Sequence, residues 1–148
     1  MATSATQTTR ASRAQPETLR FRTVMPSLNV RNIDISLLWY CSRLGFVVQD
    51  EMRSEKRLAA VTLRAGDIIF LLAQDPEPKP RNGKRGEGVG LYCTTAQEID
   101  QVAMNIRARG TVLEYGPVDQ PWGAREFAVL DPDGYRIIIS NWNLPDLA

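Results

Sequence analysis

The side chains that could do chemistry in this chain are carboxylates, tyrosines, arginines and two thiols, because its 148 residues include no histidine. A Ser-His-Asp triad, a Cys-His pair and an HExxH zinc helix are therefore excluded. Cys41 and Cys93 lie far apart and lack the spacing of a metal or redox motif, so we predict two reduced core residues.

Glu126 and Arg136 are the charged candidates for a site, because alternation along 125–130 and 135–140 places both on one face of a sheet. They either pair with each other or hold a charged group of a ligand. Tyr92 could supply a hydroxyl group to a ligand or be a satisfied core tyrosine. Trp122 could stack on a flat ligand or pack at the rim of the fold.

Two helices are predicted from apolar residues that recur with a period of 3.6. The first follows Asn32 or Asp34 as the N-cap and ends at Gly45. The second follows a capping box, Thr95 to Glu98, and ends at Gly110. The remaining β-rich segments predict strands over 24–30, 46–51, 58–64, 68–73, 89–93, 111–115, 125–130 and 135–140.

The order strand, helix, strand, hairpin occurs twice, which predicts a duplicated βαβββ unit. The helix-ending glycines Gly45 and Gly110 are 65 residues apart, and the hairpin glycines Gly66 and Gly134 are 68 apart. We therefore expect an α+β fold in which two tandem modules form a curved mixed sheet around a cavity, with the helices outside.

The domain organisation follows from composition. Residues 1–22 are rich in Ser, Thr and Arg and predict a disordered tail. Residues 23–148 form a single domain, with module one at 23–74, a linker at 75–88 and module two at 89–143. The linker is rich in Pro, Gly and charge, and its basic residues are interpreted as solvated surface charge: Lys79, Arg81, Lys84 and Arg85.

Charge and hydropathy narrow the class of partner. Beyond residue 22 the side chains sum to a net charge of −2, which argues against nucleic acid as a partner. No apolar run approaches the roughly 20 residues of a membrane span, so we expect no membrane contact and a cytoplasmic protein.

Five segments in order give the chain a family resemblance over residues 24–143: Val30–Ser36, Trp39–Tyr40, Leu44–Phe46, Ala65–Ile68 and Trp122–Gly134. With these segments the chain resembles the vicinal-oxygen-chelate superfamily of glyoxalases, extradiol dioxygenases and bleomycin-resistance proteins. The last segment is most similar to bleomycin-resistance proteins. The resemblance implies a homodimer, and it implies metal ligands on the first and fourth strands of each module.

In this sequence the implied ligand positions are Met25, Phe70, Gly90 and Ile138. A slip of one residue on the fourth strand of module one would replace Phe70 with Leu71. None of these side chains resembles the imidazole, thiolate or carboxylate that such metals use, so we predict no metal site and no cofactor.

The leading functional hypothesis is a metal-independent small-molecule binding protein, one that sequesters an antibiotic or an aromatic metabolite. The small net charge of −2 beyond residue 22 favours a neutral or aromatic ligand over a cationic drug. The residues expected to face the ligand are Met25, Phe70, Tyr92, Trp122, Glu126, Arg136 and Ile138. The alternative is a metal-free isomerase or lyase with Glu126 as general acid and base. A third hypothesis is a vestigial cavity in a protein that acts through dimer contacts.

Overall fold

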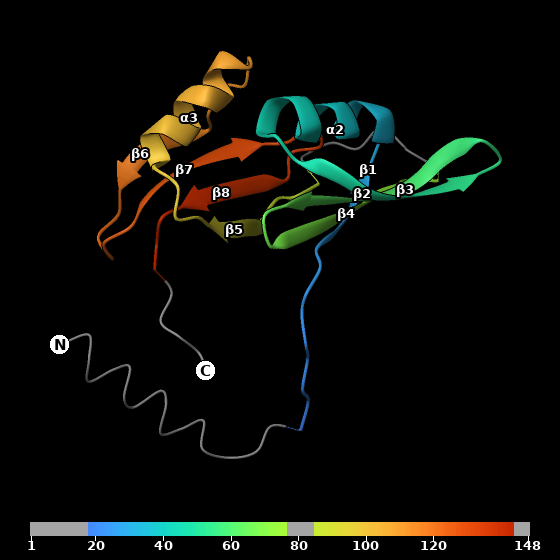
Figure 1. The fold of residues 1–148 in the computed structure, drawn as a ribbon, viewed down its shortest axis with the longest axis horizontal. Coiled ribbons are helices and arrows are strands. Elements are labelled where there is room, and N and C mark those ends of the chain that lie inside the picture. Colours follow the sequence, from blue (N-terminus) through green and yellow to red (C-terminus); the bar gives the residue numbers. More distant parts are fainter. Residues whose placement is uncertain (1–17, 77–84, 144–148) are drawn as a thin grey trace.

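The computed structural model describes residues 18–76 and 85–143, which form two βαβββ modules (Figure 1). Module one contains β1 (Ser27–Val30), α2 (Ile33–Trp39), the π-helical turn η1 (Tyr40–Leu44), β2 (Val47–Ser54), β3 (Arg57–Ala65) and β4 (Ile68–Gln74). Module two contains β5 (Gly90–Thr94), α3 (Ile99–Ala108), β6 (Tyr115–Asp119), β7 (Arg125–Leu130) and β8 (Arg136–Ser140).

Strand pairing repeats in the two modules, which confirms the α+β fold with tandem units. The sheet orders are β1-β4-β3-β2 and β5-β8-β7-β6. In module one β1 runs parallel to β4, and in module two β5 runs parallel to β8. The described strands pair only within their own module, so the mixed sheet consists of two separate four-stranded halves. None of the described helices is long and apolar enough to cross a membrane.

Capping side chains and glycines set the ends of both helical segments. Asn32 caps α2, and its side chain accepts from the backbone N–H groups of two first-turn residues. At α3 the capping side chain is Glu98 itself, so the prediction of Thr95 as the cap is wrong. Gly45 and Gly110 end the two helical segments in the left-handed region that favours glycine.

The C-terminal ends of the two helical segments also contact each other. The Arg43 guanidinium donates to the carbonyl of Arg109 and lies where a Cβ on Gly110 would be. Reciprocally, a Cβ on Gly45 would lie 3.1 Å from a guanidinium nitrogen of Arg109. Because Arg43 and Arg109 are 66 residues apart, the contact repeats the internal symmetry of the chain.

Alternation along the strands separates a core face from a face with no helix over it. Figure 1 shows both helices on the same side of the two sheets. Core residues such as Leu63, Leu72, Phe127 and Val129 point to that side and are almost fully buried. We call the opposite side of the module-two sheet the open face; it carries residues of β5, β7 and β8 that alternate with the core residues.

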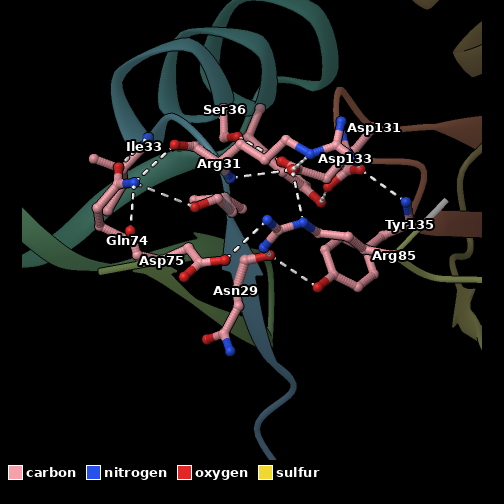
Figure 2. A network of polar contacts seen from close by, with 12 residues as sticks. Asn29, Arg31, Ile33, Ser36, Gln74, Asp75, Arg85, Asp131, Asp133 and Tyr135 are labelled. Carbon is pink, nitrogen blue, oxygen red and sulfur yellow. Dashed lines mark hydrogen bonds and ion pairs between the residues drawn. The ribbon is translucent and has the colours of Figure 1, made fainter. Parts of the chain in front are cut away.

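A network of polar contacts joins β1, α2 and η1 to the turn between β7 and β8, and we call it the closed junction (Figure 2). The hydroxyl of Tyr40, which is fully buried, donates to Asp131 at 2.8 Å. Asp133 accepts from the backbone N–H of Arg31 at 3.1 Å, and the Tyr135 hydroxyl donates to the carbonyl of Asn29 at 2.9 Å.

The linker enters the closed junction through Arg85, which corrects the expectation that this residue is surface charge. Its side chain is only 5% exposed and forms ion pairs with Asp75 at 2.9 Å and Asp133 at 3.6 Å. An arginine between two buried carboxylates balances their charge, which burial otherwise makes costly. Lys79, Arg81 and Lys84 lie outside the described residues.

Candidate functional site

A cluster of hydroxyl groups surrounds one buried carboxylate on the open face. Glu126 on β7 is 3% exposed. The Tyr92 hydroxyl donates to its Oε1 at 2.9 Å, and the Tyr115 hydroxyl donates to its Oε2 at 2.5 Å. Both carboxylate oxygens are therefore paired with charge-assisted hydrogen bonds, the arrangement that makes a buried carboxylate tolerable.

The hydrogen bonds of this cluster all donate in one direction, toward the Glu126 carboxylate. The Ser140 Oγ accepts from the backbone N–H of Trp142 at 3.0 Å and lies 2.9 Å from the Tyr92 hydroxyl. Since Tyr92 has a single proton and gives it to Glu126, Ser140 must donate to the oxygen of Tyr92. The chain of donors runs from Trp142 through Ser140 and Tyr92 to the carboxylate.

Tyr92 is the member of the cluster that reaches the surface, with 38% of the residue exposed. Its ring packs edge-on against the indole of Trp142, with centroids 6.0 Å apart. A cavity of about 410 Å³ adjoins this indole and is lined by Thr94, Thr95, Ala96, Asn141, Trp142 and Asn143. A molecule on the open face would therefore meet the Tyr92 hydroxyl before it met the carboxylate.

Tyr115 is held beneath the surface by a tight turn of backbone. Desolvation and the adjacent Glu126 carboxylate raise the pKa of Tyr115, so its hydroxyl remains a proton donor. At Gly116 the φ angle is +83°, and a Cβ would lie 2.5 Å from the Glu126 carbonyl oxygen. Only glycine allows β6 to approach β7 closely enough for this hydrogen bond.

Arg136 lies on the open face but is not part of this cluster. Its guanidinium binds Glu114 in a two-pronged ion pair, with one nitrogen 2.9 Å from a carboxylate oxygen. This ion pair raises the pKa of Arg136. The expectation that Glu126 and Arg136 pair with each other is wrong, because tyrosines occupy both oxygens of Glu126 and Glu114 occupies the guanidinium.

Three of the four metal-ligand positions implied by the resemblance lie away from the core. Gly90 and Ile138 are neighbours on the open face, where a Cβ at Gly90 would be 3.2 Å from Ile138 Cδ1. Met25 precedes β1 and is 43% exposed. Phe70, however, is 2% exposed and packs its ring against Tyr40 and Phe46 under the helix.

The expectation that Phe70 faces the cavity is therefore wrong, and Leu71 takes its place. Leu71 lies opposite Ser27 on β1, as Ile138 lies opposite Tyr92 on β5. The turn closed by Asp131 and Tyr135 in module two is one residue longer than the turn closed by Ala65 and Ile68 in module one. The prediction aligned the two hairpins on Gly66 and Gly134, which displaced the module-one position by one residue. A displacement of one residue moves a side chain to the opposite face of its strand.

These positions do not fit a metal ion. Gly90, Leu71 and Ile138 carry no donor atom, and Met25 offers a thioether, which is not a ligand that Fe or Zn sites of this kind use. The nearest carboxylate, Glu126, has both oxygens engaged by tyrosine hydroxyls. No cluster of three potential ligands drawn from Cys, Asp and Glu is present among the described residues.

Trp122 lies in the turn before β7, is 51% exposed, and takes no part in the hydrogen bonds around Glu126. The sequence did not identify Tyr115 or Trp142 as site residues. Tyr115 lay at the end of a predicted strand, 111–115, whereas β6 begins there, with a register irregularity before Val118. Alternation along 135–140 also predicts Ser140 on the face of Glu126, and its contact with Tyr92 confirms this.

Comparison of the sequence with protein-family models identifies one family for this chain. Residues 20–139 match the family model described as Glyoxalase/Bleomycin resistance protein/Dioxygenase superfamily. No curated protein matches the sequence significantly.

Solved structures share the fold across nearly their whole length. A glyoxalase/bleomycin resistance protein/dioxygenase from Nocardioides is 19% identical, with a TM-score of 0.67, covering 98% of this chain and 99% of its own. TioX from Micromonospora sp. ML1 is 20% identical, with a TM-score of 0.65, covering 80% and 97%. A virulence protein from Salmonella typhimurium is 26% identical, with a TM-score of 0.62, covering 83% and 98%.

Proposed function

Because this chain belongs to the glyoxalase/bleomycin resistance protein/dioxygenase superfamily, we propose that it binds a small neutral or aromatic molecule on the open face, without a metal ion. One observation carries the proposal. Tyr92 is 38% exposed while the proton of its hydroxyl is committed to the buried Glu126 carboxylate, so the hydroxyl oxygen can accept a hydrogen bond from a ligand.

The chemistry of the ligand follows from the groups around that hydroxyl. Gly90 and Ile138 supply a smooth apolar surface, and the Trp142 indole supplies a flat edge beside the cavity. The nearest cation, Arg136, is already paired with Glu114. A largely apolar ligand with one polar group that bonds to Tyr92 suits this surface better than a highly charged one. An antibiotic or an aromatic metabolite that the protein sequesters has this character.

The test is a thermal-shift screen of the full chain against neutral aromatic natural products and antibiotics, followed by calorimetry. We expect saturable binding that Tyr92→Phe weakens by about tenfold, the usual effect of one hydrogen bond in a binding site. Tyr135→Phe is the matched control, because its hydroxyl lies in the closed junction. Stoichiometric metal in the purified protein, measured by elemental analysis, would contradict the metal-free mode of binding.

A second candidate function is a metal-free isomerase or lyase with Glu126 as the acid and base. The observation that favours it is the hydrogen bond from Tyr92 to Glu126, because a proton could pass between a substrate and the carboxylate through this hydroxyl. Under this hypothesis Glu126→Gln abolishes turnover and leaves ligand affinity within a few fold. Under the binding hypothesis the wild-type protein returns its ligand chemically unchanged.

We also propose that the protein is a homodimer that covers apolar surface around the open face. Met25 and Val89, which precede β1 and β5, are 43% and 56% exposed. Large apolar side chains left on the surface in this way are typical of interfaces. Light scattering should report twice the chain mass at micromolar concentration, and a monomer at that concentration would exclude the homodimer.

A further inference from the structure

A second cavity, separate from the open face, lies on the helix side of the molecule between the two modules. Its volume is about 620 Å³, within the range of small-molecule sites. Module one contributes the end of η1 and the turn between β3 and β4, and module two contributes α3 and the end of β5.

The internal repeat explains why this space is empty. The cavity lies between α3 and the turn of module one, and the closed junction lies between α2 and the turn of module two. In the closed junction, Tyr40 of the helix segment bonds to Asp131 of the turn. The residues 66 positions away from these two are Ile106 and Ala65, and both line the cavity.

A second pair shows the replacement on its helix side only. Ser36 of α2 lies 3.4 Å from an Asp133 oxygen in the closed junction, whereas Val102 stands 66 positions later on α3. The turn of module one contributes Gly66 and Asp67 to the lining of the same cavity as this valine, whose side chain has no hydrogen-bonding group. Tyr40, Asp131 and Ser36 are thus replaced in the second cavity by Ile106, Ala65 and Val102, while Asp133 keeps an acidic equivalent, Asp67.

The walls and the rim of the cavity differ in character. The walls are mostly apolar and include Leu44, Phe46, Ile68, Val102, Ile106 and Ile139. At the rim, Arg109 has no carboxylate partner among the described residues, and Asn105 offers an amide. Asp67, on the facing turn, is the one acidic lining residue.

We propose that this cavity is a binding site for an apolar molecule carrying one carboxylate. The apolar body lies against the walls, and the carboxylate binds the Arg109 guanidinium at the rim. In the closed junction Arg85 pairs with the carboxylates of Asp75 and Asp133, whereas Asp67 forms no ion pair with Arg109 among the described residues, so the ligand supplies the carboxylate. An arginine binds a carboxylate with two parallel hydrogen bonds, which makes it selective for this group. Asp67 disfavours a second negative charge, so the ligand is a monoanion.

The test compares two probes of the same shape on the full chain by calorimetry: 1-naphthaleneacetate and the neutral 1-naphthaleneacetamide. We expect the carboxylate to bind at least fivefold more tightly than the amide. Arg109→Gln should remove this difference, whereas Arg107→Gln, on the same helix but outside the cavity, should keep it. A preference that is unchanged in Arg109→Gln, or no preference in the wild type, would overturn the proposal.

A chemical readout locates the bound probe. Cys93 lines the cavity, and Cys41 does not. We expect 1-naphthaleneacetate to slow alkylation of Cys93, followed by peptide mass, and to leave the rate at Cys41 unchanged. Tyr92→Phe should leave this protection intact, which separates the cavity from the open face. Equal protection of both thiols, or of neither, would place the probe elsewhere and refute the site.

Discussion

Replacing Tyr40 with Phe tests whether the closed junction holds the modules together. The substitution removes only the hydroxyl that donates to Asp131 at 2.8 Å, and it leaves a fully buried ring in place. Asp131 keeps two backbone donors, from Asp133 and Tyr135. Hydrogen bonds to charged groups contribute about 1.5–3 kcal/mol, so we expect a loss of about 2 kcal/mol in the free energy of unfolding.

This loss should depend on pH in a defined direction. Burial raises the pKa of Asp131 above its ordinary value of 3.8, so the folded protein holds this proton more tightly than the unfolded chain. Its contribution to stability is greatest below the unfolded pKa and is lost as the pH rises through the folded pKa. The Tyr40 hydroxyl opposes this rise in pKa. Its removal therefore costs most at neutral pH and less in acid, where a protonated carboxyl needs no donor.

The assay is urea unfolding at several pH values, followed by tryptophan fluorescence. Tyr135→Phe is the matched control, because it removes a hydroxyl from the same junction that bonds to a neutral carbonyl. We expect about 1 kcal/mol or less for the control. A double-mutant cycle with Asp131→Asn isolates the pair. If Tyr40→Phe costs no more than Tyr135→Phe and the coupling is near zero, the reasoning about the closed junction fails.

Three further predictions can be checked with the same protein. Gly116→Ala should lose at least about 3 kcal/mol of unfolding free energy, because a positive φ angle and a clash with the backbone combine. Gly123→Ala is the control: its new Cβ meets open space, so only the positive φ angle costs free energy, about 1 kcal/mol. Arg85→Met should lose about 3 kcal/mol in urea unfolding by removing the buried cation between two carboxylates, and adding Asp133→Asn should restore part of it. Burial raises the pKa of the Cys93 thiol to about 11, so its alkylation rate at pH 8, measured by mass spectrometry, should be about 100-fold below that of a free thiol.

Features that depend on local sequence were predictable in this chain. Helix ends follow from single residues such as Asn32, Gly45 and Gly110, whose side chains or backbone freedom act within one turn. The faces of β7 and β8 followed from alternation, which placed Glu126 and Ser140 on the same side. The duplication was visible because both modules keep these landmarks in the same order.

Features that depend on register or on long-range pairing were not predictable. Phe70 was assigned to the wrong face because one extra turn residue in module two changes the spacing between hairpins. Arg85 was interpreted as surface charge because nothing local shows that Asp75 and Asp133 converge on it. One of the two partners of Glu126 was missed, because Tyr115 reaches it from the irregular strand β6, whereas the sequence pattern predicted a strand that ends at Tyr115.

The closed junction has a consequence for the order in which the chain can acquire its structure. Tyr40 and Asp131 are 91 residues apart, and the partner of this buried tyrosine lies in the turn of module two, which follows module one in the chain. During synthesis module one therefore emerges with a buried hydroxyl group that has no acceptor. We expect the two modules to unfold and refold as one cooperative unit despite their separate sheets, since neither completes its interior without the other.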